Sequence, residues 1–345
     1  MTDFKRYLRE YDGPPVRLME VCGTHTAQIS RCGIASMLSP KIRLVSGPGC
    51  PVCVTVTSYV DRLVELSLNP GTAVVSFGDM LRVRGTSMSL NDAKAEGGSV
   101  RMVYSPLDAL KLAREDPSTE YVFAAVGFET TAPVYAMLLD EAVLSDVTNL
   151  KILTSLKTMP PVIDTICAKQ GGVDGFLAPG HVSVITGSDI FLPLAEKYGI
   201  PFVVAGFEGE QILAAVYALV KLRGKGTAMN LYPSAVTAKG NETAQESVRK
   251  YFEPCDAAWR GIGLIRGSGV ALRKEYARFD AGGAELTGDA GFEPGCSCAE
   301  VLTGALSPLE CPLFGKVCTP ENPRGACMVS TEGSCFHYYV NRRRV

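Results

Sequence analysis

The sequence predicts an α/β fold, with two parallel-sheet α/β domains followed by a C-terminal domain of mixed, loop-rich structure. Short apolar runs rich in valine, isoleucine and alanine alternate with amphipathic stretches, which is typical of βαβ units. The 345 residues exceed one ordinary hydrophobic core and allow two or three domains. From about residue 282 onward glycine, proline and cysteine dominate, so we expect a bound metal centre to stabilise this last part.

Strands and helices are expected in alternation along the chain. The strands are expected at residues 17–21, 42–46, 72–77, 100–104, 121–126, 151–154, 175–178 and 201–205. The helices, in which apolar residues recur every three or four positions, are expected at residues 57–68, 106–114, 132–144, 161–170 and 208–222. We therefore divide the chain into an α/β domain at 16–118, a second at 119–240, and a cysteine-rich cluster domain formed by 1–15 and 241–345.

Charge and hydropathy exclude two classes of partner. The net charge of −2 gives no electrostatic reason to expect nucleic acid or an anionic membrane. The first residues lack the apolar segment of a signal peptide, and no stretch approaches the roughly 18 apolar residues of a membrane span. We therefore expect a cytoplasmic protein. In that reducing compartment, the twelve cysteines indicate metal ligation or redox chemistry rather than structural disulfides.

Half of these cysteines fall within forty residues near the C-terminus: Cys296, Cys298, Cys311, Cys318, Cys327 and Cys335. Thiolates are soft ligands that suit iron–sulfur clusters and zinc, and a [4Fe–4S] cluster needs four of them. Six thiols are two more than that cluster needs. The spacing alone leaves open a zinc site or buried thiols without a ligand.

A second cysteine motif is Gly47-Pro48-Gly49-Cys50-Pro51-Val52-Cys53, between an expected strand and an expected helix. A C-x-x-C turn at the N-terminus of a helix has lowered thiol pKa values and can open and close a disulfide. The flanking glycines let the backbone come close to the site. Redox or metal chemistry is therefore favoured over a purely structural role for Cys50 and Cys53.

A third motif, Glu20-Val21-Cys22-Gly23-Thr24-His25-Thr26, also ends an expected strand. Cys22 and His25 could hold one metal ion, although such a pair is as often a packing feature. With Cys50 and Cys53 it offers three thiols and an imidazole on neighbouring loops of one sheet. His181 follows a further strand and either faces the same crevice or is structural. Cys32, Cys167 and Cys255 have no partner nearby in sequence and are expected to be buried.

Two similar segments, Gly127-Phe128-Glu129-Thr130 and Gly206-Phe207-Glu208-Gly209, each join a strand to a helix. Glu129 and Glu208 are therefore expected at the carboxyl edge of a parallel sheet, where open α/β folds place their ligands. An equally plausible role is helix capping, in which the carboxylate complements the positive end of the helix dipole.

These motifs together resemble the signatures of the HypD family, which acts in [NiFe]-hydrogenase maturation. The resemblance rests on Cys22-Gly23-Thr24-His25-Thr26, on Gly47 to Cys53, on Gly127-Phe128-Glu129-Thr130-Thr131, on Pro179-Gly180-His181-Val182 and on Pro323 to Ser330, and it spans about residues 16–340. It implies a [4Fe–4S] cluster on the pattern C-x14-C-x6-C-x16-C, which Cys296, Cys311, Cys318 and Cys335 reproduce. It also implies that Cys298 and Cys327 can form a disulfide beside the cluster, as in ferredoxin:thioredoxin reductase.

The resemblance further implies a scaffold, monomeric on its own, rather than a conventional turnover enzyme. Such a scaffold binds an iron ion together with a small HypC-type chaperone while cyanide and carbon monoxide ligands are installed. Cys22, with His25 close by, would face this iron, and Cys50 with Cys53 would be the redox-active pair. A HypE-type partner donates the cyanide. Two alternatives stay open: a thiol–disulfide reductase of the ferredoxin:thioredoxin reductase type, and a zinc-stabilised interaction protein.

Overall fold

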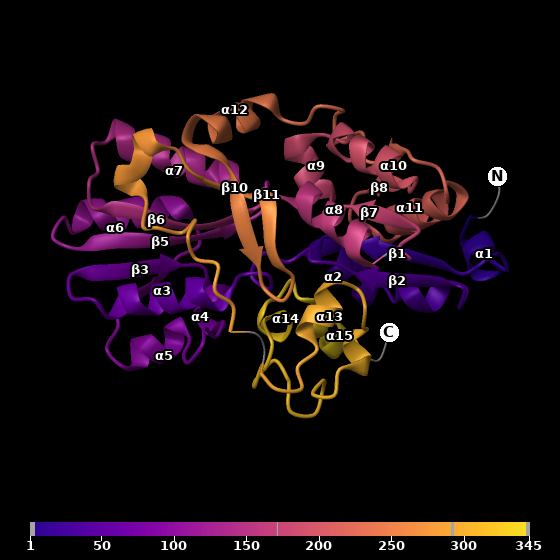
Figure 1. Cartoon of the computed structure of the whole chain (residues 1–345), viewed down its shortest axis with the longest axis horizontal. Coiled ribbons are helices and arrows are strands. Elements are labelled where there is room, and N and C mark those ends of the chain that lie inside the picture. The colour runs from indigo at the N-terminus through magenta and orange to yellow at the C-terminus, as the bar shows by residue number, and fades with distance from the viewer. Residues whose placement is uncertain (1–3, 171, 291–292, 343–345) are drawn as a thin grey trace. The chain divides into compact units, whose positions relative to one another are not determined.

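The computed structural model describes residues 4–170, 172–290 and 293–342, apart from the side chain of residue 170 (Figure 1). By their contacts these residues form two compact units. Unit 1 comprises Met1–Cys53, Ile163–Glu242 and Phe292–Val345, and unit 2 comprises Val54–Val162 and Thr243–Gly291. Each unit is therefore assembled from segments far apart in the sequence.

Unit 1 contains a five-stranded, all-parallel sheet in the order β2-β1-β7-β8-β9. Its strands are β1 (Val16–Glu20), β2 (Ile42–Ser46), β7 (Gly175–Ala178), β8 (Phe202–Val204) and β9 (Ala228–Asn230). The central strands are apolar on both faces, as expected for a parallel sheet covered on both sides. Met19, Phe176 and Phe202 are paired across three strands, and the rings of Phe176 and Phe202 stack at 4.9 Å.

The helices of unit 1 lie between these strands and in the C-terminal segment. They are α1 (Phe4–Arg9), α2 (Gly23–Arg31), η1 (Ile34–Met37), α9 (Gly180–Thr186), η2 (Asp189–Phe191), α10 (Leu192–Tyr198), α11 (Gly209–Lys221), α13 (Cys298–Leu302), η4 (Pro308–Glu310), α14 (Ala326–Val329) and α15 (Ser334–Val340), with α8 (Met159–Gln170) shared between the units. Leu8, Ile29 and Leu213 bring α1, α2 and α11 into one apolar core with β1, β7 and β8. The residues from 293 to 342 form short helices joined by loops, and α15 packs on α2 (Figure 1).

Unit 2 contains a six-stranded sheet in the order β10-β11-β6-β5-β3-β4. Its strands are β3 (Thr72–Ser76), β4 (Val100–Met102), β5 (Glu120–Gly127), β6 (Leu150–Lys157), β10 (Phe252–Trp259) and β11 (Gly263–Leu272). Its helices are α3 (Thr57–Leu68), α4 (Gly78–Arg82), α5 (Leu90–Ala95), α6 (Pro106–Glu115), α7 (Ala132–Leu144), α12 (Glu242–Tyr251) and η3 (Lys274–Phe279). Strands β3 to β6 are parallel, whereas β10 and β11 form an antiparallel hairpin on the edge of β6.

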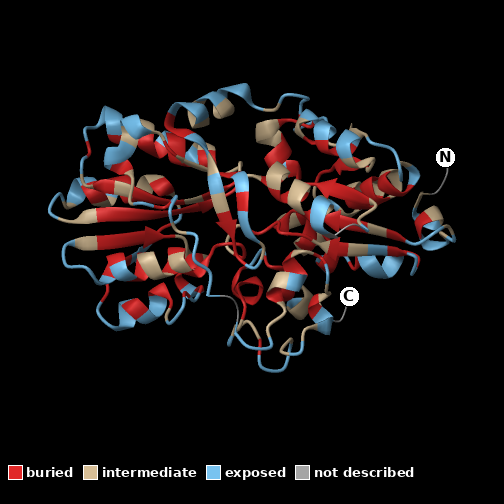
Figure 2. Cartoon of the chain, in the orientation of Figure 1, coloured by how far each residue is buried: buried red, intermediate tan, exposed pale blue. Residues whose placement is uncertain are grey.

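The α/β fold class is confirmed, since both sheets are largely parallel and lie between helices. Figure 2 shows the strands as mostly buried and the outer helical faces as exposed. Each of the expected strands and helices is present within a few residues, while β9, the β10–β11 hairpin and several short helices were not expected. Among the described helices none is long and apolar enough to cross a membrane.

The three-domain division stays a prediction, although contacts group the described chain differently. Helix α1 packs on α11 through Tyr7 and Tyr217, whose ring centroids are 5.2 Å apart. The C-terminal cysteine segment likewise belongs to unit 1. The expectation for the isolated cysteines is wrong: Cys32, the C-cap residue of α2, is exposed, and Cys167 and Cys255 are half-buried.

Candidate functional site

The carboxyl edge of the unit 1 sheet gathers four loops that carry candidate residues. Cys22 follows β1, Cys50 follows β2, His181 follows β7 and Phe207 follows β8. Because the strands are parallel, their carboxyl ends lie at one edge, where open α/β sheets bind ligands. The first two loops are in direct contact, since the Gly23 N–H donates to the Gly49 carbonyl at 3.0 Å.

Cys22 is the N-cap residue of α2 and is buried, with 7% of its surface exposed. Burial, with a smaller contribution from the charges of Glu20 and Glu332, raises the pKa of its thiol to about 12. The backbone N–H groups of His25 and Thr24 act in the opposite direction. The thiol therefore keeps its proton at neutral pH until a cation replaces it, which is how metal binding to a cysteine releases a proton.

Glu20 forms a hydrogen bond with the backbone of Cys22, and it was not among the residues predicted from the sequence. Its carboxylate is buried and accepts hydrogen bonds from the Cys22 N–H, at 3.0 Å, and from the Thr26 hydroxyl. Burial raises the pKa of Glu20 to about 7, partly offset by these bonds and by Ser46. The available signal was a charged residue inside an apolar strand, two positions before a candidate cysteine.

His25 and His181 lie around the ring of Phe207. Their ring centroids are 4.9 Å and 4.1 Å, respectively, from that ring. His25 is fully buried, and burial lowers its pKa to about 4, so its imidazole is neutral at pH 7. His181 is the second residue of α9 rather than a loop residue, because α9 begins directly after β7.

The tautomer of His25 follows from the hydrogen bond between its ring and the backbone of Gly206. The ring nitrogen Nε2 lies 3.0 Å from the carbonyl oxygen of Gly206, which can only accept, so Nε2 carries the hydrogen. Nδ1 then presents a lone pair. Within the described part of the chain Nδ1 has no hydrogen-bond partner, although it is buried. A buried acceptor without a partner is rare in folded proteins and indicates a place for a ligand.

Cys50 and Cys53 form a disulfide in a buried turn, with their Cα atoms 5.3 Å apart. A Cβ added to Gly49 would lie 2.7 Å from the Cys22 Cα atom, so only glycine lets this turn touch Cys22. The expected position of the pair at a helix N-terminus is wrong. The N-cap of α3 is Val56, three residues after Cys53, because the turn continues through Val54.

The six C-terminal cysteines form a second group of thiols, with two of them on α13 and α14. A hydrogen bond with Cys298 and then burial raise the pKa of Cys296, and Cys311 raises it further. The pKa of Cys327 is raised by hydrogen bonds with Cys298 and with Cys335. For Cys318 the main cause of a raised pKa is burial, with smaller effects of Cys335 and Cys311.

These six thiols therefore converge, which the sequence spacing could only suggest. Among the described residues, no group of three or more His, Cys, Asp or Glu side chains surrounds a single metal ion. In a cubane cluster each thiolate binds a different iron, so its ligands stand further apart than those of one ion. Four soft donors and two further thiols in one loop-rich segment fit such a cluster. The Arg324 N–H donates to Cys318 Sγ at 3.3 Å, a contact that would favour a thiolate there.

The C-terminal segment and the loops of the sheet edge contact each other within unit 1. Cys53 Sγ lies 3.8 Å from the carbonyl oxygen of Ala326, the residue before Cys327. The Ser30 hydroxyl of α2 donates to the His337 carbonyl at 2.9 Å, and Glu332 packs against Gly23. The two groups of cysteines, far apart in sequence, are thus neighbours in the fold.

The two Gly-Phe-Glu glutamates have different surroundings. Glu208 is exposed at the N-cap of α11, where its backbone N–H donates to Gln211 Oε1 at 3.1 Å. Glu129 belongs to unit 2, and its carboxylate accepts from the N–H of Met159, the first residue of α8, at 2.7 Å. Burial raises the pKa of Glu129 to about 7. Both thus lie at helix N-termini, which is the capping arrangement considered from the sequence.

An α/β fold whose sheet edge carries a buried thiol, a neutral imidazole and a disulfide, beside six further thiols, defines a protein whose chemistry is carried by cysteines. The model of the HypD family, described as "Hydrogenase formation hypA family", matches residues 3–342. The chain is 41% identical over 340 residues to the hydrogenase maturation factor HypD of Azotobacter vinelandii, covering 95% of this chain and 90% of that protein.

Further relatives agree. The HypD factor of Escherichia coli is 41% identical over 345 residues, covering 96% of this chain and 90% of that protein. The HypD factor of Cupriavidus necator is 40% identical over 343 residues, covering 95% and 90%. The chain therefore belongs to the HypD family of hydrogenase maturation factors.

Proposed function

We propose that this maturation factor is a cytoplasmic, monomeric scaffold on which the Fe(CN)2CO unit of [NiFe]-hydrogenase is assembled. The iron ion is its cargo, bound between Cys22 and a HypC-type chaperone. The observation that carries the proposal is a buried Cys22 thiol three residues before a neutral His25 whose Nδ1 has no hydrogen-bond partner among the described residues. Soft thiolate and imidazole donors suit an iron(II) centre that also takes cyanide and carbon monoxide.

The Cys50–Cys53 pair would supply the electrons that free cyanide from its carrier. A HypE-type partner presents cyanide as a protein thiocyanate, in which carbon is bonded to sulfur. When the two thiols attack, the carbon–sulfur bond breaks and a sulfur–sulfur bond forms. The two thiols together lose two electrons, which reduce the thiocyanate, and two protons. One proton goes to the thiol of the carrier and the other to cyanide. This step would leave Cys50 and Cys53 as a disulfide, and the geometry of the turn allows that bond.

The reduced pair must then be regenerated. A [4Fe–4S] cluster held by Cys296, Cys311, Cys318 and Cys335 would supply electrons one at a time. Cys298 and Cys327 would exchange with the Cys50–Cys53 disulfide. The 3.8 Å approach of Cys53 Sγ to the residue before Cys327 supports a short route between the pairs. Arg324 and Gly325, through their backbone N–H groups, oppose the raised pKa of Cys318 and favour its ligand form.

Anaerobic purification, alone and with the HypC-type partner, tests the proposal. We expect a brown protein with about four irons and four sulfides, and infrared bands of metal-bound cyanide and carbon monoxide in the complex only. A colourless protein with bound zinc and no such bands contradicts the proposal and leaves the zinc-stabilised interaction protein.

The disulfide gives a second candidate some support, namely a thiol–disulfide reductase of the ferredoxin:thioredoxin reductase type. Such an enzyme reduces a generic protein disulfide over many turnovers without a HypC-type partner. We expect no turnover of this kind here without the maturation partners, because Cys50 and Cys53 are almost fully buried in the chain alone. An assay with a small and a protein disulfide separates the two functions.

A further inference from the structure

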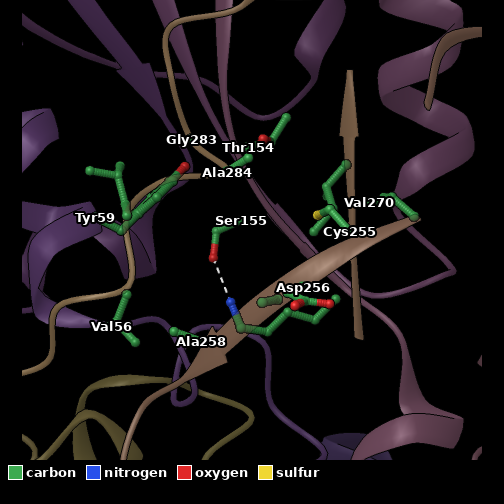
Figure 3. Close-up of a pocket in the computed structure, with 14 residues that line it drawn as sticks. Val56, Tyr59, Thr154, Ser155, Cys255, Asp256, Ala258, Val270, Gly283 and Ala284 are labelled. Carbon is green, nitrogen blue, oxygen red and sulfur yellow. Dashed lines mark hydrogen bonds between the residues drawn. The ribbon is translucent and has the colours of Figure 1, made fainter. Parts of the chain in front are cut away.

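Unit 2, which carries none of the candidate metal ligands, contains a cavity of about 30 Å³ (Figure 3). In Figure 3, Val56 and Tyr59 lie on one side of it and Cys255 and Val270 on the other. Strand β6, the β10–β11 hairpin, residues near the start of α3 and the segment 283–286 form its wall. A volume of this size holds about two water molecules or a small ion.

A buried cation lines this cavity. Lys157, the last residue of β6, is only 3% exposed, and its Nζ donates to Ser155 Oγ at 2.8 Å, the dashed line in Figure 3. An ammonium group has three donors, and this bond uses one. Within the part of the chain that the structure describes, no carboxylate forms an ion pair with Lys157. Lysine is almost never buried this deeply unless its charge is paired.

The surroundings leave space beside the ammonium instead of filling it. Lys157 is paired across the sheet with Gly269, which in turn is paired with Cys255. A Cβ on Gly269 would lie 2.7 Å from the Ala257 Cβ atom and 3.2 Å from Cys255 Sγ, so this position stays glycine and offers no side chain as a partner for the ammonium. The ring of Trp259, centred 5.9 Å from Nζ, offers a partial cation–π contact. That contact compensates one face of the ammonium only.

The titratable groups around Lys157 are few. Tyr59 faces the cavity from α3, and Cys255 and Asp256 face it from β10. Asp256 is exposed to solvent, and its carboxylate accepts from the Gly267 N–H at 2.9 Å. Burial lowers the pKa of Lys157 to about 8, so the amine is mostly protonated at neutral pH. The positive charge is therefore present, and no carboxylate of the described residues pairs with it.

We infer that this cavity binds a small monovalent anion, held by the Lys157 ammonium and the Ser155 hydroxyl. The Ser155 oxygen accepts from Lys157, so its own hydrogen is free to point at the anion. An ion of the size of chloride or nitrate suits the volume, and a large organic anion does not. This site is separate from the scaffold chemistry proposed above, which lies on cysteines of unit 1.

The chain carries its own reporter for this site, because Trp259 is the sole tryptophan. The experiment titrates the full-length protein with sodium nitrate or chloride against sodium gluconate at constant ionic strength, and records Trp259 emission at about pH 6.5. We expect a saturable change in the wild-type protein and none in Lys157→Met. Lys151→Met is the matched control: Lys151 lies on the same strand but pairs with Glu120 at 2.8 Å, and this variant should titrate like the wild type.

Two further measurements make the result decisive. The Ser155→Ala variant should bind the anion about tenfold more weakly than the wild type. If Lys157→Met does not fold, this weaker binding is the result that tests the inference. At about pH 9.5 the wild-type affinity should fall, because Lys157 loses its proton. Burial raises the pKa of both Cys255 and Tyr59, two further titratable groups that face the cavity, from β10 and α3. A wild-type response that does not saturate, or a saturable response that survives in Lys157→Met, overturns the inference.

Discussion

The imidazole of His25 donates from Nε2 to the Gly206 carbonyl oxygen at 3.0 Å, and its buried Nδ1 has no hydrogen-bond partner among the residues that the structure describes. The bond joins the first turn of α2 to the loop after β8. It therefore fixes both the tautomer and the orientation of the ring, which is how proteins prepare a histidine for a metal. Two predictions about the iron cargo follow from this geometry.

The first concerns His25 itself. His25→Ala removes the Nδ1 lone pair, so we expect iron retention in the complex with the HypC-type chaperone to fall about 10- to 100-fold. His181→Ala is the control, since the His181 ring also packs on Phe207, at 4.1 Å, but His181 is exposed. Iron analysis after gel filtration of each complex measures the effect. Equal losses in the two variants would show that the ring stack, and not Nδ1, matters.

The second concerns Cys22. Cys22→Ala should abolish chaperone-dependent iron retention and leave the visible absorbance of the cluster unchanged, because the cluster thiols lie elsewhere in unit 1. Cys32→Ala is the matched control, because Cys32 lies at the other end of α2 and is exposed. This variant should retain iron like the wild type. Absorption spectra and iron analysis of both complexes provide the test. Loss of iron and absorbance together in Cys22→Ala would indicate a folding defect.

Much of this site follows from local sequence pattern. Parallel strands place their carboxyl ends at one edge, so assigning the strands before Cys22, Cys50 and His181 was enough to predict that their loops gather. The burial of Glu20 was not predictable, because it depends on Thr26 returning over the strand from α2. The position of Phe207 between two imidazoles likewise arises only when β8 pairs with β7.

The β10–β11 hairpin was not predicted from the sequence, because it too depends on contacts between distant segments. Strand β11 contains three glycines, which carry little strand signal. Strand β11 is held by its pairing with β10 and with β6, and β6 lies more than a hundred residues earlier in the chain. The same pairing creates the cavity beside Lys157. The burial of Lys157 could not be predicted from its position at the end of an apolar strand, because strand ends are usually solvated.

A third prediction tests the contact between the C-x-x-C turn and Cys22. In Gly49→Ala the new methyl group would lie 2.7 Å from the Cys22 Cα atom, so one of the two loops must move. We expect a loss of about 1–3 kcal/mol in the free energy of unfolding and weaker iron retention. Gly209→Ala is the control, because its Cβ would lie 3.4 Å from Cys32 Sγ. Urea denaturation of both variants measures the difference, and equal stability of the two would refute the contact.

The last prediction uses the buried carboxyl group of Glu129 in unit 2. Burial raises its pKa from 4.5 to about 7, so between these values the folded protein keeps a proton that the unfolded chain has lost. The folded state then binds more protons, and the free energy of unfolding must fall as pH rises from about 4.5 to about 7. A shift of this size corresponds to about 3 kcal/mol. Glu129→Gln keeps an oxygen acceptor for the Met159 N–H but cannot titrate.

We therefore expect Glu129→Gln to lose this decline, with its advantage over the wild type growing as pH rises from about 4.5 to about 7 and levelling off above that. Glu120→Gln is the matched control, because Glu120 begins β5, the strand that leads to Glu129, but pairs with Lys151 at the surface. Denaturation followed by Trp259 emission reports on unit 2 itself, since Trp259 is buried there. A wild-type slope retained in Glu129→Gln would mean that its carboxyl group is ionised in the folded protein. The Oε2 atom of Glu129 is buried and has no hydrogen bond among the described residues. An ionised carboxylate would then require a cation or a water molecule as a partner for this atom.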